Sequence, residues 1–300
     1  MSIAVPQATI VNAPIANAPI VNAMSVDVED YFQVEALAGA VSRDDWNVMP
    51  PRVAANTDRL LDLFAESATH ATFFTLAWVA ERHPDLIRRI LAAGHELASH
   101  GLDHTRVDRQ TPEVFRADLR RSRAILEDVG GTPINGYRAA SFSIGAGNLW
   151  AFDVLEEEGY AYSSSIYPIR HDLYGMPDAS RTPFRPRHGK LIEIPLTTVR
   201  RFGRNLPCAG GGYFRLLPYW LSQANLRRVH AQDNSACVFY LHPWEVDPAQ
   251  PRVAGLGVKS RFRHYLNLGA TEGRLRRLLG AFAWDRVDRV FLGPDPSSNP

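Results

Sequence analysis

Residues 71–98, ATFFTLAWVAERHPDLIRRILAAGHELA, contain the pattern that decides the fold. A β-rich run at 71–75 is followed by an amphipathic stretch at 84–93 and by a second β-rich run at 95–98. Pro84 stands where first-turn prolines belong, and a glycine follows the last periodic residue, so the stretch predicts a helix between two strands. This succession of strand, helix and strand favours parallel strands.

The same alternation extends over most of the chain. Its 300 residues permit two ordinary domains or one large α/β barrel, and the alternation predicts the α/β class with a largely parallel sheet or barrel. We expect the aperiodic segment 170–189 to be a long surface loop near the functional site. Further strands are expected at 24–28, 134–137, 161–165, 191–195 and 237–241, and further helices at 57–68, 112–129 and 147–158.

Composition excludes several classes of protein. The formal net charge is +1, so no global field would hold the chain on nucleic acid or on an anionic membrane. No apolar run reaches the length of a membrane span, and the first basic residue is Arg43, which is unlike the start of a signal peptide. A cytoplasmic location is therefore expected. Two cysteines, Cys208 and Cys237, lack zinc-site spacing, so a bound metal would need histidine and carboxylate ligands.

The two ends of the chain differ from its centre. Residues 1–23 carry a short proline-punctuated repeat, which predicts a flexible N-terminal arm. We expect a catalytic domain over 24–250 and an arginine-rich extension, packed on that domain, over 251–300. Within the extension, the pattern predicts helices at 261–268 and 272–283 and a last strand at 287–292.

Titratable residues follow two of the predicted strands. His100 and His104 have a four-residue spacing that would place both imidazoles on one helical face, as two metal ligands require, although a surface helix with two histidines fits equally well. Asp27, Glu29 and Asp30 end the first strand. Because barrels and open α/β sheets bind ligands at the carboxyl ends of their strands, both groups are expected at one mouth.

Two further strands also end in groups that can ionise. Asp27 lies inside a β pattern, where an unpaired carboxylate is costly to bury unless a cation or an arginine meets it. Arg138 follows the predicted strand 134–137 and offers that positive charge. His242 ends the hydrophobic strand 237–241 and is a candidate acid or base.

Taken in order, these residues resemble the polysaccharide deacetylases of carbohydrate esterase family four, over about residues 24–245. The sequences around these residues are most similar to those of the exosortase-associated deacetylases of bacterial exopolysaccharide gene clusters, which also have a C-terminal extension. The segments that carry the resemblance are Val26-Asp27-Val28-Glu29-Asp30-Tyr31-Phe32, His100-x-x-x-His104, Tyr137-Arg138-Ala139-Ala140-Ser141-Phe142-Ser143, Gly210-Gly211-Gly212-Tyr213-Phe214-Arg215 and Leu241-His242-Pro243-Trp244-Glu245.

The resemblance implies a distorted (β/α) barrel of about seven strands and a site for one divalent metal ion. His100 and His104 would be ligands, with Glu29 or Asp30 as the third, because Val28 separates the two acids that usually stand side by side in the family. Zinc is the expected ion, and the same donors also suit cobalt, nickel or iron(II).

The resemblance also implies roles for the remaining residues. Asp27 would be the general base, oriented by Arg138, and His242 would protonate the leaving amine. The backbone N–H near Ser141 would help to hold the oxyanion, while Tyr31 and Trp244 could stack on sugar rings. This chain departs from the family at two positions: Ala140 replaces a frequent proline, and Ser163 replaces an aspartate that supports the catalytic histidine.

The implied function is metal-dependent N-deacetylation of N-acetylhexosamine units in an exopolysaccharide or cell-wall glycan, with release of acetate. The expected partner is that glycan, and the sequence leaves the oligomeric state open. One alternative is a metal-free amidohydrolase of the allantoinase-like branch. The other is an inactive glycan-binding module, which Ser163 favours and the retained Asp27, Arg138 and His242 oppose.

Overall fold

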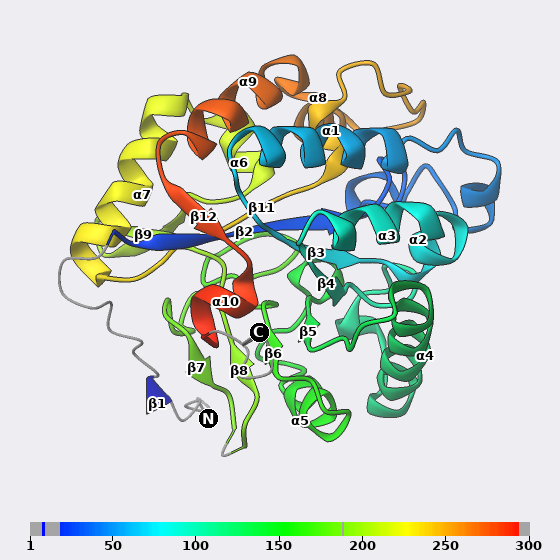
Figure 1. Cartoon of the computed structure of the whole chain (residues 1–300), viewed down its shortest axis with the longest axis horizontal. Coiled ribbons are helices and arrows are strands. Elements are labelled where there is room, and N and C mark those ends of the chain that lie inside the picture. The colour runs from blue at the N-terminus through cyan, green and yellow to red at the C-terminus, as the bar shows by residue number, and fades with distance from the viewer. Residues whose placement is uncertain (1–7, 10–18, 188, 294–300) are drawn as a thin grey trace.

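A curved sheet of parallel strands forms the centre of the computed structural model, which describes residues 8–9, 19–187 and 189–293 (Figure 1). In this part of the chain, seven parallel strands follow the order β8-β6-β5-β4-β3-β2-β11. The expected α/β class and distorted barrel are confirmed. The strands are β2 (Val21–Val28), β3 (Thr72–Thr75), β4 (Glu96–Ser99), β5 (Gly136–Tyr137), β6 (Tyr162–Ser163), β8 (Ile192–Glu193) and β11 (Val238–Leu241).

Helices surround this sheet, and α1, α3, α4 and α5 lie outside the strands in Figure 1. The longest shows why the sequence signals are reliable: Thr111 accepts a hydrogen bond from the Val114 backbone, Pro112 begins the helix, and Gly131 ends it with a φ of 63°. The helices are α1 (Val53–Glu66), α2 (Ala77–Arg82), α3 (Pro84–Ala92), α4 (Pro112–Gly130), α5 (Trp150–Glu157), α6 (Gly211–Leu216), α7 (Tyr219–Asp233), α8 (Val258–Tyr265), α9 (Leu268–Leu279) and α10 (Val287–Phe291).

Shorter strands complete the structure. β7 (Phe184–Arg185) pairs antiparallel with β8 and also with β1 (Ala8–Thr9). β9 (Thr198–Arg201) and β10 (Arg204–Pro207) form a separate hairpin, which the sequence analysis did not predict. Strand β2 begins at Val21, three residues before the expected start of the catalytic domain. Most of the expected N-terminal arm, residues 1–7 and 10–18, lies outside the described residues.

The C-terminal segment differs from the sequence prediction. The expected strand at 287–292 is wrong, because residues Val287–Phe291 form helix α10. Val287 and Phe291 are both buried, and their four-residue separation places them on one helical face. A short apolar run does not distinguish a strand from a buried helix by its pattern alone. The last strand is instead β12 (Ala283–Asp285), which pairs in parallel with β2.

Helix α7 was missed for a related reason. Its buried face includes the polar residues Ser222 and Asn225 beside Leu226 and Val229, so its hydrophobic period is weak. Within the described ranges, no helix combines the length and the apolar character that a bilayer crossing requires.

A buried carboxyl group at the start of β4 predicts a pH-dependent stability. Burial raises the pKa of Glu96 to about 8, although Thr72 and Tyr162 donate hydrogen bonds to it. The group therefore stays protonated in the folded state at pH values where the unfolded chain is ionised. Stability should fall as the pH rises from about 4.5 towards 8.

Glu96→Gln removes this ionisation while keeping a neutral polar side chain. We expect the variant to gain stability over the natural chain on the order of 2 kcal/mol at pH 8, and to gain much less at pH 5. Urea unfolding at both pH values measures the difference. An advantage that is the same at both pH values would contradict the assignment.

Candidate active site

The carboxyl ends of β2, β4 and β11 surround one cavity of about 360 Å³. Seven of the residues proposed from the sequence line it, so the expectation that these strand ends meet at one mouth agrees with the structure. The expected loop 170–189 also reaches the cavity, through His171, Leu173 and Tyr174. The seven lining residues are Asp27, Glu29, His100, His104, Ser141, His242 and Trp244.

Glu29, His100 and His104 form a cluster with the geometry of a metal site. One potential ligand atom from each residue lies within 4.8 Å of the others. His104 Nε2 is 2.9 Å from Glu29 Oε2, and all three residues are buried. Two imidazoles and one carboxylate are a common ligand set for zinc and other transition metals that keep open coordination positions.

The sequence analysis expected His100 and His104 on one helical face, and this expectation is wrong. β4 ends at Ser99, and the segment that follows is a loop. Gly101 and His104 both have positive φ values, 82° and 61°, and these bends return the chain so that the two imidazole rings lie 5.4 Å apart. The four-residue spacing therefore brings the rings together by means of a tight loop. A non-glycine residue in this conformation costs about 1 kcal/mol, which the surrounding structure must compensate.

Hydrogen bonding prepares His100 for a metal ion. Its Nδ1 lies 2.8 Å from the backbone carbonyl of Arg138, which can only accept, so Nδ1 carries the proton and Nε2 keeps its lone pair. Burial lowers the pKa of His100 to about 4, which keeps the ring neutral at neutral pH. Metals bind the neutral form of histidine.

Glu29 has the charge that the cluster needs. Its burial raises the pKa, but His104 and then His242 and His100 outweigh this effect and lower the pKa to about 2. Its buried Oε2 atom lies 2.9 Å from His104 Nε2, and no other described residue donates a hydrogen bond to it. A cation bound between Glu29 and the two histidines would place a positive charge beside this buried carboxylate.

Asp30 and Tyr31, two of the residues proposed from the sequence, lie away from the cavity. Asp30 Oδ2 accepts hydrogen bonds from the backbone N–H groups of Arg52 and Val53, at 2.6 and 2.9 Å, where α1 begins. Its Oδ1 accepts another from the Tyr31 backbone. Tyr31 is fully buried in a hydrophobic cluster with Phe32. Both side chains therefore have structural contacts beneath the site.

A buried ion pair fixes Asp27. Arg138 is completely buried, and its Nη1 donates to Asp27 Oδ1 at 2.6 Å and to Ser25 Oγ at 2.8 Å. Its Nε and Nη2 donate to the carbonyl and hydroxyl oxygens of Ser164, and its guanidinium group lies 4.0 Å from the Phe74 ring centre. Asp27 Oδ2 remains free of Arg138 and lies 3.9 Å from His242 Nε2. Asp27 and His242 are thus close neighbours on the cavity wall.

Ser141 lies on the cavity wall in an unusual conformation. Ser141 and Phe142 follow each other with φ values of 52° and 50°. Two consecutive non-glycine residues in this region are costly, and such conformations are concentrated at functional sites. The strained turn follows β5 and places Ser141 and Phe142 on the cavity wall.

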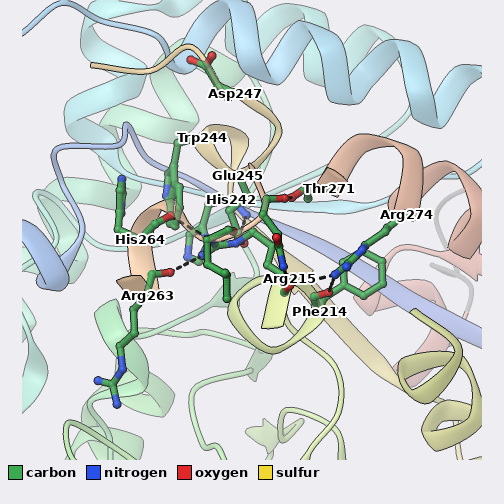
Figure 2. Close-up of polar contacts among 12 residues, drawn as sticks. Phe214, Arg215, His242, Trp244, Glu245, Asp247, Arg263, His264, Thr271 and Arg274 are labelled. Atoms are coloured by element: carbon green, nitrogen blue, oxygen red, sulfur yellow. Dashed lines mark hydrogen bonds and ion pairs between the residues drawn. The ribbon is translucent and has the colours of Figure 1, made fainter. Parts of the chain in front are cut away.

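The imidazole of His242 is held by a residue to which the sequence analysis gave no role. Its Nδ1 is 2.7 Å from Glu245 Oε1 (Figure 2). Its Nε2 is 3.4 Å from Glu29 Oε1. Burial alone would lower the pKa of His242. The hydrogen bond to Glu245 and the charge of Glu29 outweigh this effect and raise the pKa to about 9. Trp244 is nearly buried between the rings of His242 and His264, with centroid distances of 5.2 and 4.3 Å.

The C-terminal extension supplies another wall that the sequence analysis did not predict. Lys259, Phe262 and Arg263 of α8 line the cavity. Lys259 and Arg263 form ion pairs with Asp172 of the loop 170–189. No sequence period could reveal these contacts, because they join segments almost ninety residues apart.

Comparison with known proteins agrees with this architecture. Residues 44–162 match the polysaccharide deacetylase family, and residues 164–292 match a domain of unknown function, DUF3473. A chitooligosaccharide deacetylase from Rhizobium leguminosarum is 35% identical over 48% of this chain and 60% of its own length. A second, from Sinorhizobium fredii, is 31% identical over 37% of this chain and 49% of its own length. The chain thus spans less than two thirds of these curated relatives.

Solved structures show the same fold at low sequence identity. A Mycobacterium smegmatis protein assigned to the polysaccharide deacetylases has a TM-score of 0.59 at 20% identity, and the match covers 90% of this chain and 88% of that one. The PuuE allantoinase has a TM-score of 0.58 at 19% identity, over 90% and 88% of the two chains. The fold alone is therefore common to both chemistries. With the sequence match and the barrel fold, the chain contains a polysaccharide deacetylase domain over residues 44–162.

Proposed function

We propose that this protein is a metal-dependent deacetylase that removes acetyl groups from N-acetylhexosamine units of a polysaccharide. The observation that carries the proposal is the proximity of Asp27 and His242 to the Glu29–His100–His104 cluster in one cavity. Amide hydrolysis needs a base for the attacking water and an acid for the leaving amine, and this cavity offers one of each.

The residues of the cluster fit a divalent ion. The protonated Nδ1 and neutral ring of His100 and the nearby carboxylate of Glu29 all support binding. We propose Glu29 as the third ligand in preference to Asp30, because backbone N–H groups already occupy the oxygens of Asp30. The ion would supply Lewis-acid polarisation of the acetyl carbonyl and of water. Zinc is the ion we propose, and cobalt, nickel or iron(II) would suit the same donors.

The chain's own residues then move the protons. Asp27 Oδ2 accepts a proton from the attacking water, while Arg138 holds Oδ1 in place. The backbone N–H near Ser141 donates to the carbonyl oxygen as negative charge develops on it. His242 donates the proton on Nε2 to the amide nitrogen as the C–N bond breaks. The products are acetate and a free amine on the sugar.

We propose a glycan of an exopolysaccharide or cell wall as the substrate. The curated relatives are chitooligosaccharide and peptidoglycan N-acetylglucosamine deacetylases, which act on N-acetylated sugars according to their names. The aromatic ring of Tyr213 and the side chain of Phe262 at the cavity could contact sugar faces. Contacts to remote sugars can orient the scissile amide, so longer oligosaccharides should react faster than monomeric N-acetylglucosamine.

Acetate release tests this function. We expect the metal-loaded protein to release acetate from N-acetylated oligosaccharides and the chelator-treated protein to lose this activity. Addition of the ion should restore it. Full turnover after complete removal of metal would instead support the metal-free, allantoinase-like alternative.

A further inference from the structure

A series of hydrogen bonds and ion pairs connects His242, the proposed general acid, to the C-terminal extension (Figure 2). It begins at His242, whose backbone N–H and side-chain Nδ1 both lie within hydrogen-bond distance of Glu245 Oε1, at 3.1 and 2.7 Å. A carboxylate at Nδ1 holds that proton, so the ring orientation is fixed and Nε2 is directed towards Asp27 and Glu29. Glu245 therefore occupies the position of an orienting acid.

The contact between Glu245 and His242 compensates for the aspartate that is absent at position 163. The family resemblance leads one to expect an aspartate there, as support for the catalytic histidine. In this chain the buried Ser163 hydroxyl donates to Ser165 Oγ at 2.8 Å, and a hydroxyl cannot supply the negative charge of a carboxylate. Glu245, three residues after His242 in the chain, supplies that charge from a different segment.

Glu245 is itself held by an arginine. Its side chain is fully buried, and an isolated carboxylate in such a place is costly. Arg215 Nε donates to Glu245 Oε2 at 2.6 Å, and only 2% of the Arg215 side chain is exposed. The carboxylate thus accepts from His242 on one oxygen and from Arg215 on the other.

The C-terminal extension holds Arg215 in turn. Nη1 donates to the backbone carbonyls of His264 and Leu266 at 2.8 and 2.9 Å, and Nη2 donates to the carbonyl of Arg263 at 3.0 Å. These carbonyls lie at the end of α8, where a helix has no partners of its own for its last carbonyl groups. All three nitrogens of the guanidinium group are therefore occupied, and its orientation is fixed.

The glycines Gly210 and Gly211 leave room for the side chains of Tyr240 and Glu245. A Cβ atom on Gly211 would lie 1.8 Å from Glu245 Oε1, and one on Gly210 would lie 2.2 Å from the ring of Tyr240. Any larger residue at Gly211 would push the carboxylate from its place. The segment from Gly210 to Arg215 thus both admits Glu245 and binds it.

We propose that Glu245 is the positioning residue of His242, and that the C-terminal extension fixes it in place through Arg215. The inference rests on the proposed function for the role of His242 as the acid. Every member of this chain of contacts lies within residues 164–292, the region of unknown function, whereas His100 and His104 lie within residues 44–162. The second region thus supplies the acid half of the active site.

Glu245→Gln tests the proposal, because it keeps the shape of the side chain and removes its charge. For an N-acetylated oligosaccharide, we expect kcat to fall by roughly 10- to 10³-fold, with KM and metal content little changed. Arg215→Lys keeps a positive charge but not the fork of donors, and should give an intermediate loss of kcat. If Glu245→Gln does not fold, this second variant carries the kinetic test.

Arg274 provides a matched control. Its Nη1 donates to the carbonyls of Phe214, Arg215 and Leu217, so it ties down the same segment as Arg215 does, and its bonded partners do not include Glu245. Arg274→Gln should lower the thermal stability and leave kcat within about threefold of the natural chain. An equal loss of kcat in Arg274→Gln and Glu245→Gln would overturn the proposal, as would an unchanged kcat in Glu245→Gln.

A spectroscopic measurement separates this proposal from the proposed function. The His242 Nδ1 proton, bonded to a carboxylate, should give a downfield proton NMR signal, identified by its loss in His242→Asn. We expect Glu245→Gln to shift this signal strongly and Arg274→Gln to leave it in place. A natural chain that shows the signal but releases no acetate would refute the function alone. An unshifted signal in Glu245→Gln would refute the positioning role alone.

Discussion

Asp27→Asn should lower kcat by roughly 10²- to 10⁴-fold while the divalent ion stays bound. The amide has nearly the same shape and can still accept the hydrogen bond that Arg138 Nη1 now donates to Oδ1 at 2.6 Å. It cannot take a proton from water. The variant should also be less stable, because Arg138 is fully buried and would keep its charge without a carboxylate partner.

Ser25→Ala is the control for this variant. It removes another acceptor of Arg138 Nη1, at 2.8 Å, and leaves the carboxylate of Asp27 intact. We expect kcat to fall less than tenfold, since only the alignment of the base is weakened. Steady-state kinetics with elemental analysis of each protein measures both effects. If Asp27→Asn kept the kcat of the natural chain, another group would be the base.

Replacing both His100 and His104 with alanine should abolish binding of the divalent ion. The change removes two of the three protein ligands that we propose. Glu29 would remain as a single ligand, and one carboxylate does not hold a transition metal tightly. Activity on glycans should disappear with the metal. Elemental analysis of the purified double variant gives the occupancy, and full occupancy would contradict the site.

Asp30→Asn separates the two carboxylates that could be the third ligand. Asp30 accepts hydrogen bonds from the start of α1, so its replacement should cost about 1 kcal/mol of stability and leave the metal content unchanged. Glu29→Gln should instead lower the metal content. The reverse pattern would assign the ligand to Asp30.

The sequence was informative wherever a regular period or a strand end determined the structure. The alternation of strands and helices was enough to predict the barrel, since buried parallel strands need helices between them. The ends of its strands also indicated Asp27, His100 and His242 correctly as neighbours, because parallel strands direct their carboxyl ends to one mouth.

The sequence was uninformative wherever a long-range contact decided the outcome. Glu245 and Arg215 stood in segments that the sequence analysis quoted, but only the fold shows that the carbonyls at the end of α8 meet Arg215. His104 was placed on a helix because spacing alone does not reveal the positive φ values of a loop. Tyr31 lies near the strand end in sequence, yet its side chain is buried in the hydrophobic core.

Mass spectrometry of the reaction products tests the central claim most directly. The metal-loaded protein is incubated with N-acetylated oligosaccharides of increasing length and, separately, with a small ureide or cyclic amide. We predict a loss of about 42 Da for each acetyl group replaced by hydrogen, matched by an equal amount of acetate, and no turnover of the ureide. Turnover of the ureide with no loss of mass from any glycan would contradict the account.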